Sequence, residues 1–401
     1  MDALSVALLP LALALLLWPQ AIRGACLQLA AWAPLPALAL ALLASDGLTR
    51  ELPGLLLGVQ LGVDATGRLF LLFSALVWLA AGVYARGYLR HDPRRHVFWF
   101  FFLVAQSGSL GLALAQDAAS FYTFFTLMTF AAWGLVVYSR DTAAQRAGWV
   151  YLVMALVGEA ALLVGLIVSA RAADSLLLAD MASAAPPVAV ALLIAGFGVK
   201  AGLPLLHMWL PLAHPIAPVP ASAVLSGVMI KAGLLGWMRF LPLSTEPWPL
   251  LGAAALLLGL LAALIAVLIG LTQRQPKVLL AYSSISQMGF MTLGIGAALL
   301  HPGAWPALAP ALALYALHHG LAKGTLFLGV AALAQATGAA RRWALAMQAL
   351  PALALAGLPL SSGFWAKDGL KQALSNLPAP WPEALSWLLP IGALGTTLLM
   401  L

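Results

Sequence analysis

Four lysines lie within long apolar segments of this 401-residue chain, and these lysines are the side chains best suited to chemistry. The chain has six lysines in all, whereas every arginine lies at a segment end or in a loop; the four are Lys200, Lys231, Lys323 and Lys367. A lysine in hydrocarbon costs roughly 2.5 to 3.5 kcal/mol, which a function must offset. Loss of hydration favours the neutral amine, so a buried lysine can release its proton, whereas arginine stays charged. The pattern predicts proton transfer within a membrane.

A structural reading of the same lysines is the alternative. A lysine near the end of an apolar segment can extend its head group to the membrane surface and keep its stem in the apolar layer. This reading has more weight for Lys323 and Lys367 than for Lys200 and Lys231, whose stems would have to cross a long apolar stretch.

The composition defines the class of protein. Hydrophobic residues make up 63% of the chain and charged residues 8%, and the mean hydropathy is +0.99. A soluble globule of this length needs far more polar surface, so we expect an all-α polytopic membrane protein. The net charge is +7, and we expect the excess lysines and arginines to lie in cytoplasmic loops. No basic run indicates nucleic-acid binding. The single cysteine, Cys26, excludes an internal disulfide.

Apolar windows of about 17 to 25 residues predict about thirteen transmembrane helices. The expected spans are 3–20, 25–45, 66–86, 97–115, 118–139, 148–170, 187–213 with a break, 219–241, 249–272, 278–300, 307–335, 343–366 with a break, and 384–401.

Basic residues in alternate loops predict the orientation. One side holds Arg23, Arg86, Arg90, Arg94, Arg95, Arg140, Arg146, Arg274, Lys277, Arg341 and Arg342. The other side holds only Arg50, Arg68, Arg171, Arg239 and Lys371. The positive-inside rule then places the richer side in the cytoplasm and the N-terminus outside, in a bacterial-type inner membrane.

A repeated pentapeptide indicates internal symmetry. Ala-Gly-Leu-Pro-Leu occurs at 201–205 and again at 356–360, each time in an apolar segment near a lysine. Glycine and proline interrupt a helix there, and in lipid the freed backbone groups need protein or water partners. An odd number of spans separates the copies, which predicts two inverted five-helix repeats. The expected parts are an N-terminal region 1–96, a first repeat 97–242 broken near 203, and a second repeat 249–401 broken near 359.

Four motifs carry a family resemblance. They are KAGLPLLHMWLPLAHPIAPVPASAVLSGVMIKAG at 200–233, KVLLAYSSISQMG at 277–289, HGLAK at 319–323 and SGFWAKD at 362–368. From about residue 97 onward the chain resembles the antiporter-like membrane subunits. These are the proton-pumping subunits of respiratory complex I and their relatives in membrane-bound hydrogenases and Mrp-type cation/proton antiporters.

The resemblance implies a role for each buried lysine. Lys200 resembles the input-side proton carrier and Lys231 the next step. His319 and Lys323 lead on toward Lys367, the exit-side carrier. Polar side chains must bridge these steps; the candidates are Ser226, Ser283, Ser284 and Gln287. Helix packing by small residues is an equally good reading of the serines.

One departure concerns the carboxylate partner of the first lysine. The resemblance implies a glutamate in the fifth span, paired with Lys200, but Thr126 occupies the matching position. The nearby mid-span carboxylate is Glu159 in the sixth segment, and we expect it to have taken over the pairing. The alternative is a degenerate subunit that conducts poorly or serves only as a scaffold.

Histidines and one further carboxylate complete the candidates. His207 is a site candidate, and His214 has a partly structural role. His318 lies on a different helix face from His319 and receives no role. Asp368 is adjacent to Lys367, but adjacent helical side chains do not face one another, so another partner is equally plausible.

Nothing in the chain indicates redox or metal chemistry. It has no cysteine cluster, no nucleotide-binding glycine loop and no metal-ligand spacing, so we expect no cofactor. The resemblance implies a proton-translocating subunit, with Na+ as an alternative ion, among the other membrane subunits of a hetero-oligomeric complex. Family members usually continue past a thirteenth span, so we expect a shortened chain. The alternative function is a scaffold in an inorganic-carbon uptake complex that binds a soluble zinc protein.

Overall fold

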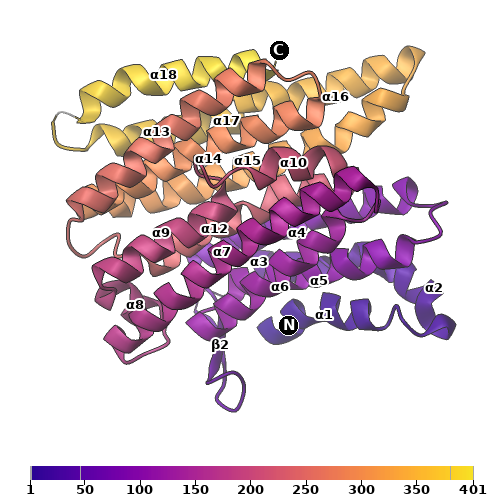
Figure 1. Cartoon of the computed structure of the whole chain (residues 1–401), viewed down its shortest axis with the longest axis horizontal. Coiled ribbons are helices and arrows are strands. Elements are labelled where there is room, and N and C mark those ends of the chain that lie inside the picture. The colour runs from indigo at the N-terminus through magenta and orange to yellow at the C-terminus, as the bar shows by residue number, and fades with distance from the viewer. Residues whose placement is uncertain (1, 46, 380, 401) are drawn as a thin grey trace.

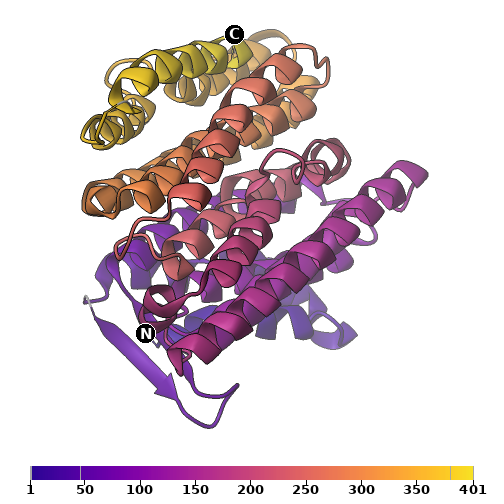
Figure 2. The same ribbon diagram turned by 60° about the vertical axis from the view of Figure 1, so that its left-hand side comes forward.

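The structure is a stack of long helices, with the second half of the chain lying on the first (Figure 1). It is a computed structural model and describes residues 2–45, 47–379 and 381–400. In Figure 1 the indigo α1 lies low in the stack and the yellow α18 lies at the top. Figure 2 shows the same order from another side, with the long α7 along one flank.

The elements follow one another with short connections. In chain order they are α1 (Ala3–Leu15), α2 (Gln20–Leu29), the 3₁₀ helix η1 (Ala30–Trp32), α3 (Leu35–Leu43), β1 (Leu48–Leu52), β2 (Val59–Val63), α4 (Ala65–Tyr88), α5 (Arg95–Leu114), α6 (Ala118–Val136), α7 (Thr142–Ala173), α8 (Leu178–Ala184), α9 (Pro187–Ala201), α10 (Trp209–Ile216), α11 (Val219–Val224), the π helix η2 (Leu225–Met229), α12 (Lys231–Phe240), α13 (Pro249–Leu271), α14 (Pro276–Leu300), the 3₁₀ helix η3 (Pro302–Ala304), α15 (Trp305–Gln335), α16 (Gly338–Ala356), α17 (Ser362–Ser375) and α18 (Trp381–Met400).

Many of these helices can cross a membrane. Among the described residues, nine helical runs have the length and hydropathy for a span, and α1 and α9 are shorter apolar helices. The nine are Gln20–Leu43, Ala65–Tyr88, Arg95–Leu114, Ala118–Val136, Thr142–Ala173, Val219–Phe240, Pro249–Leu271, Pro276–Leu300 and Trp381–Met400. Helices satisfy their own backbone groups, which is why apolar sequence of this length adopts them in lipid. The expectation of a helical membrane protein is confirmed.

Two helices are interrupted at the repeated pentapeptide. The last turn of α9 is followed by Gly202 with φ 80°, and α16 is followed by Gly357 with φ 92°. These left-handed dihedrals suit glycine, which ends a helix without a Cβ penalty. The chain then resumes as α10 and α17 respectively.

Both copies of the pentapeptide adopt the same backbone conformation. Their last residues, Leu205 and Leu360, have φ of 70° and 67°. The amides of Leu203 and Leu358 each donate to the carbonyl five residues earlier, both at 3.0 Å. Two segments that lie 155 residues apart in the chain therefore make the same turn, with the same hydrogen bond.

The expected span 219–241 is not a uniform α helix. It consists of α11, the π turn η2 and α12, and the Ile230 amide donates to the Leu225 carbonyl at 3.2 Å. A π turn widens the helix and frees a carbonyl, and such turns often mark functional sites. The sequence analysis had not predicted it, because one inserted residue leaves the hydropathy of the segment unchanged.

A two-stranded hairpin between α3 and α4 was also not predicted. β1 and β2 pair antiparallel, with Arg50 opposite Leu61. Leu61 also bridges Ala115, so the hairpin packs against the end of α5. Five-residue strands provide too short an alternation to separate them from loop sequence.

Two glycines bring the two halves of the chain close together in the interior. A Cβ on Gly227 would lie 3.0 Å from the Gly320 carbonyl oxygen, and one on Gly320 would lie 2.8 Å from the Gly227 carbonyl oxygen. Helices η2 and α15 therefore approach with their backbones almost in contact. This contact brings the lysines of the first half near those of the second.

Candidate functional site: a line of buried lysines

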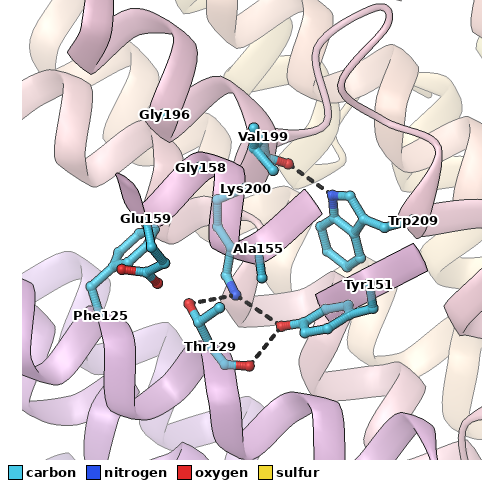
Figure 3. A pocket seen from close by; sticks show the side chains of 10 residues that line it. All are labelled: Phe125, Thr129, Tyr151, Ala155, Gly158, Glu159, Gly196, Val199, Lys200 and Trp209. Atoms are coloured by element: carbon cyan, nitrogen blue, oxygen red, sulfur yellow. Dashed lines mark hydrogen bonds between the residues drawn. The ribbon is translucent and has the colours of Figure 1, made fainter. Parts of the chain in front are cut away.

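Lys200 lies in a small, largely apolar pocket at the first helix break. Its side chain is 5% exposed, and its Nζ donates to Thr129 Oγ1 at 3.1 Å and to the Tyr151 hydroxyl at 3.3 Å (Figure 3). The aromatic rings of Phe125, Tyr151 and Trp209 lie within 5.7 to 6.0 Å of Nζ. Neutral hydroxyls and ring faces hold this amine without a bonded carboxylate.

Trp209 fixes the broken helix around this lysine. Its indole Nε1 donates to the Val199 carbonyl at 2.8 Å, which ties α10 back onto the last turn of α9 (Figure 3). The carbonyls freed at a helix end need such partners in an apolar environment. The break therefore has a fixed geometry beside Lys200.

Glu159 faces the same cavity from α7, but it contacts Thr126. The Thr126 hydroxyl donates to Glu159 Oε2 at 2.8 Å, and Oε1 has no hydrogen-bond partner within the described chain. Lys200 and Glu159 line one cavity of about 20 Å³, room for about one water molecule. They do not form an ion pair within 4.0 Å, so the expected direct pairing is not seen in this arrangement.

A pair of serine hydroxyls lies between the backbone carbonyls that hold two buried lysines at the centre. Lys231 donates to the Ser226 carbonyl, which the π turn presents, and Lys323 donates to the Leu280 carbonyl at 2.9 Å. Between these carbonyls, the hydroxyls of Ser226 and Ser284 are 2.8 Å apart, and Ser284 also donates to Leu280. Both lysines are fully buried.

The other bridging candidates have different surroundings. Ser283 Oγ is buried without a hydrogen-bond partner in the described chain. Gln287 instead connects α15 to α18: its Oε1 accepts from the Tyr315 hydroxyl at 2.9 Å, and its Nε2 donates to Thr396 at 2.9 Å. Tyr315 was not predicted, although it lies four residues before His319, and four-residue spacing repeats along one helix face.

Three of the four candidate histidines are buried, and the fourth is half-buried. His319 is fully buried, and neither ring nitrogen has a partner in the part of the chain that the structure describes. His318 is also buried, and its Nδ1 lies 2.8 Å from Ser362 Oγ at the start of α17. His214 is fully buried against the Phe327 ring, and His207 is half-buried beside the Tyr282 ring. The sequence-based prediction assigned His318 no role, yet this side chain contacts the second break.

Lys367 lies at that second break, on α17. Its Nζ donates to the carbonyls of Leu355 at 2.7 Å and Ala356 at 3.2 Å, which the end of α16 leaves free. It lines a cavity of about 250 Å³ together with Tyr315. Asp368 accepts a hydrogen bond from Gln372 rather than from Lys367, so Gln372 is its partner.

The described residues contain no group of three or more histidine, cysteine, aspartate or glutamate side chains that could hold a metal ion. The polar side chains buried in the described part of the chain are amines, hydroxyls, imidazoles, amides and the carboxylates of Asp117 and Glu159. Such groups can hold and pass protons.

Comparison with known proteins identifies the family. Residues 115–381, most of the chain, match the family profile described as NADH:quinone oxidoreductase/Mrp antiporter, TM. The chain belongs to this family. The resemblance seen in the lysine-rich motifs is therefore confirmed.

Relatives of this NADH:quinone oxidoreductase/Mrp antiporter family member come from several complexes. It is 32% identical to NADH-quinone oxidoreductase subunit N of Desulforudis audaxviator (strain MP104C), over 77% of this chain and 65% of the relative. It is 30% identical to hydrogenase-4 component B of Escherichia coli (strain K12), over 83% of this chain and 53% of the relative. The chain spans about half to two thirds of the length of these curated relatives.

A solved structure has the same fold. A chain of the Mrp complex from Dietzia sp. DQ12-45-1b superposes on 98% of this chain, and on 46% of its own length, with a TM-score of 0.87 at 23% identity. The helical arrangement in Figures 1 and 2 is thus the antiporter-like membrane fold.

Proposed function

We propose that this chain is a proton-translocating subunit of a complex I-like, hydrogenase-like or Mrp-type membrane complex. The observation that carries the proposal is the hydroxyl pair of Ser226 and Ser284, which lies between the carbonyls that hold Lys231 and Lys323. Two amines in a dry interior, with hydroxyls between their carbonyl partners, have the chemistry that stepwise proton transfer requires.

The carbonyls and the hydroxyls have different parts in this scheme. A carbonyl only accepts, so those of Ser226 and Leu280 hold each ammonium in place. A hydroxyl both donates and accepts, so the Ser226–Ser284 pair can pass a proton. Each lysine moves from its carbonyl to a hydroxyl, directly or through water, when it exchanges its proton.

At the first break, Glu159 is the carboxylate that controls the charge of Lys200. Its free Oε1 faces the cavity that Lys200 shares, and the space suffices for one bridging water. When the pair approaches, the opposite charge favours the ammonium form; when it separates, the proton leaves for the hydroxyls. His207 takes part at the rim of this break.

At the second break, His319 and His318 carry the proton on toward Lys367. His318 supports this path by its 2.8 Å contact with Ser362, one turn before Lys367 on the same helix. Imidazole donates through one nitrogen and accepts through the other, which suits a link between α15 and α17.

The two halves of the chain are inverted repeats in this proposal. The repeat 97–242 and the repeat 249–401 follow an N-terminal region 1–96, with about thirteen spans in all. The identical turns at Gly202 and Gly357 support this symmetry. So does the packing, since α9 packs on α7 as α16 packs on α15.

The orientation has the basic loops in the cytoplasm and the N-terminus outside a bacterial-type plasma membrane. Arg94 and Arg140 line a cavity at one end of α5, while Arg239 lies at its other end. The partners are other membrane subunits, and the ion is the proton, with Na+ as the alternative.

The test is pH-gradient formation in inverted membrane vesicles that carry the assembled complex. Replacement of Lys200 or Lys231 by alanine is expected to abolish proton movement, and Arg171→Ala, at the exposed end of α7, is the control. Full flux in assembled Lys200→Ala and Lys231→Ala complexes would contradict the proposal. The scaffold function, with a soluble zinc protein as partner, would then be the better account.

A further inference from the structure

A large groove lies at the end of the bundle where α5 begins, α6 ends and α7 begins. Its volume is about 540 Å³, within the range of ligand sites. The wall consists of apolar and aromatic side chains; these are Val97, Phe101, Trp133, Val137, Trp149 and Leu152. The rim carries Arg94, Arg140 and Gln145. The groove is apolar along the helices and basic where the helices end.

The groove opens onto a helix face with no protein neighbour in this chain. On α7, Trp149 is 66% exposed, and Val153, Leu156 and Val157 on the following turns are exposed as well. A row of exposed apolar side chains on a membrane-spanning helix faces lipid or another membrane chain. The groove is therefore accessible from the bilayer.

The arginines of the rim form no close ion pair among the described residues. Within the described residues, no carboxylate lies within 4.0 Å of the guanidinium of Arg94 or Arg140. The guanidinium of Arg94 lies 5.3 Å from the Tyr138 ring centroid, which positions it without cancelling its charge. Of the carboxylates nearest in sequence, Asp92 accepts from the Arg94 amide at 2.8 Å and lies near the Tyr138 hydroxyl, and Asp141 accepts from the Ala144 amide at 2.7 Å.

The backbone also directs Arg140 to this rim. Its φ is 63°, a left-handed value that non-glycine residues seldom adopt, and its carbonyl accepts from Gln145 Nε2 at 3.2 Å. The turn between α6 and α7 is thereby fixed around the groove. Two arginines and one amide side chain thus surround the entrance.

We propose that this groove binds one anionic phospholipid, with its phosphate on Arg94 and Arg140 and one acyl chain along Trp133, Trp149 and Leu152. Guanidinium groups bind phosphate oxygens through paired N–H donors. Basic pockets between transmembrane helices on the cytoplasmic side favour anionic lipids. Free phosphate would use the rim alone and leave the apolar wall without a partner, so the groove fits a lipid better.

The test is photolabelling of the assembled complex, purified in detergent and delipidated. The probe is phosphatidylglycerol with a diazirine in one acyl chain, and the labelled peptides are mapped by mass spectrometry. We expect labelling of the α7 segment around Trp149 and Leu152. The double variant Arg94→Gln/Arg140→Gln should raise the half-saturating lipid concentration about 30-fold, at roughly 1 kcal/mol for each arginine. Arg146→Gln, on the same surface but outside the groove, should leave it unchanged.

A second variant tests the apolar wall independently of charge. Leu152→Trp fills the groove and should weaken labelling by phosphatidylglycerol while the arginines remain. Equal labelling by phosphatidylcholine, displacement of the probe by millimolar inorganic phosphate, or unchanged labelling of both variants would overturn the proposal. A photoreactive residue in place of Trp149 that cross-links a neighbouring protein chain instead of lipid would also overturn it.

Discussion

Thr126 on α6 donates a 2.8 Å hydrogen bond to the carboxylate of Glu159 on α7. Thr126 occupies the position where the family resemblance implies a glutamate, and it now binds the glutamate of the neighbouring helix. The carboxylate of Glu159 thus lies beside position 126, where the family resemblance implies a glutamate and this chain has a threonine. This relationship supports the proposal that Glu159 takes over the pairing with Lys200.

Replacement of Glu159 by glutamine is expected to reduce proton flux about tenfold or more, since the amide cannot hold the ammonium form of Lys200. Flux is measured as pH-gradient formation in vesicles with the assembled complex. The double variant Thr126→Glu/Glu159→Thr moves the carboxylate across the helix contact and should restore part of the flux. Unaltered flux in Glu159→Gln would remove the basis for the pairing.

The charge-release role of Lys200 predicts that arginine cannot replace this lysine. Lys200→Arg keeps a positive charge but cannot deprotonate, so flux should be lost about as completely as in Lys200→Ala. If only a charge beside Thr129 and Tyr151 mattered, arginine would support transport. The same vesicle assay separates the two cases, with immunoblots to show that both complexes assemble.

The serine pair at the centre allows a closely matched comparison. Ser284→Ala removes the hydroxyl that contacts Ser226 and should slow proton movement about two- to tenfold, the value of one hydrogen bond. Ser283→Ala removes a neighbouring buried hydroxyl that has no partner within the described residues. Equal slowing by both substitutions would show that packing, not the hydroxyl pair, matters here.

We expect His318 to contribute to proton flux, although no sequence motif marks it. His318→Gln keeps one hydrogen bond to Ser362 but has no titrating nitrogen, so flux should fall and its pH dependence should change shape. Ser362→Ala removes the contact alone and should have a smaller effect. Normal flux and an unchanged pH profile for His318→Gln would leave His319 as the sole histidine step.

The ion pair outside the bundle predicts a pH-dependent stability. Desolvation by burial raises the pKa of Asp64, but the charge of Arg239, together with hydrogen bonds from Arg239 and the Gly67 amide, lowers this pKa below its usual value. The stabilisation is complete above about pH 4 and is lost as the pH falls through the lowered pKa. Asp64→Asn should therefore lower the apparent Tm at pH 7 by about 2 to 4 °C.

The Tm difference between Asp64→Asn and wild type should shrink below about pH 4, when the wild-type carboxyl is also neutral. Thermal unfolding in detergent at both pH values measures it. Glu246→Gln, in an exposed loop, is the control and should leave Tm unchanged at either pH. A difference that persists at low pH would indicate a role for Asp64 other than this ion pair.

The sequence by itself predicted the features that depend on composition and local backbone chemistry. A chain this apolar must form helices in lipid, because only helices satisfy the backbone there. The long motifs around Lys200 and Lys231 pointed to the family, which the comparisons confirm. Gly202 and Gly357 can adopt left-handed conformations without a Cβ penalty, and each is followed closely by proline, so the helix ends near them could be predicted from short stretches of sequence.

Only the tertiary structure decided which polar groups meet. Ser283 and Ser284 are adjacent in the chain, yet only Ser284 contacts Ser226, and His318 rather than His319 contacts Ser362. The physical reason is that these helices are apolar on most faces, so hydropathy does not fix their rotation. Rotation is set instead by packing between distant segments, such as the close approach of Gly227 and Gly320. The contact of Thr126 with Glu159 likewise depends on how α6 packs on α7, which neither helix specifies alone.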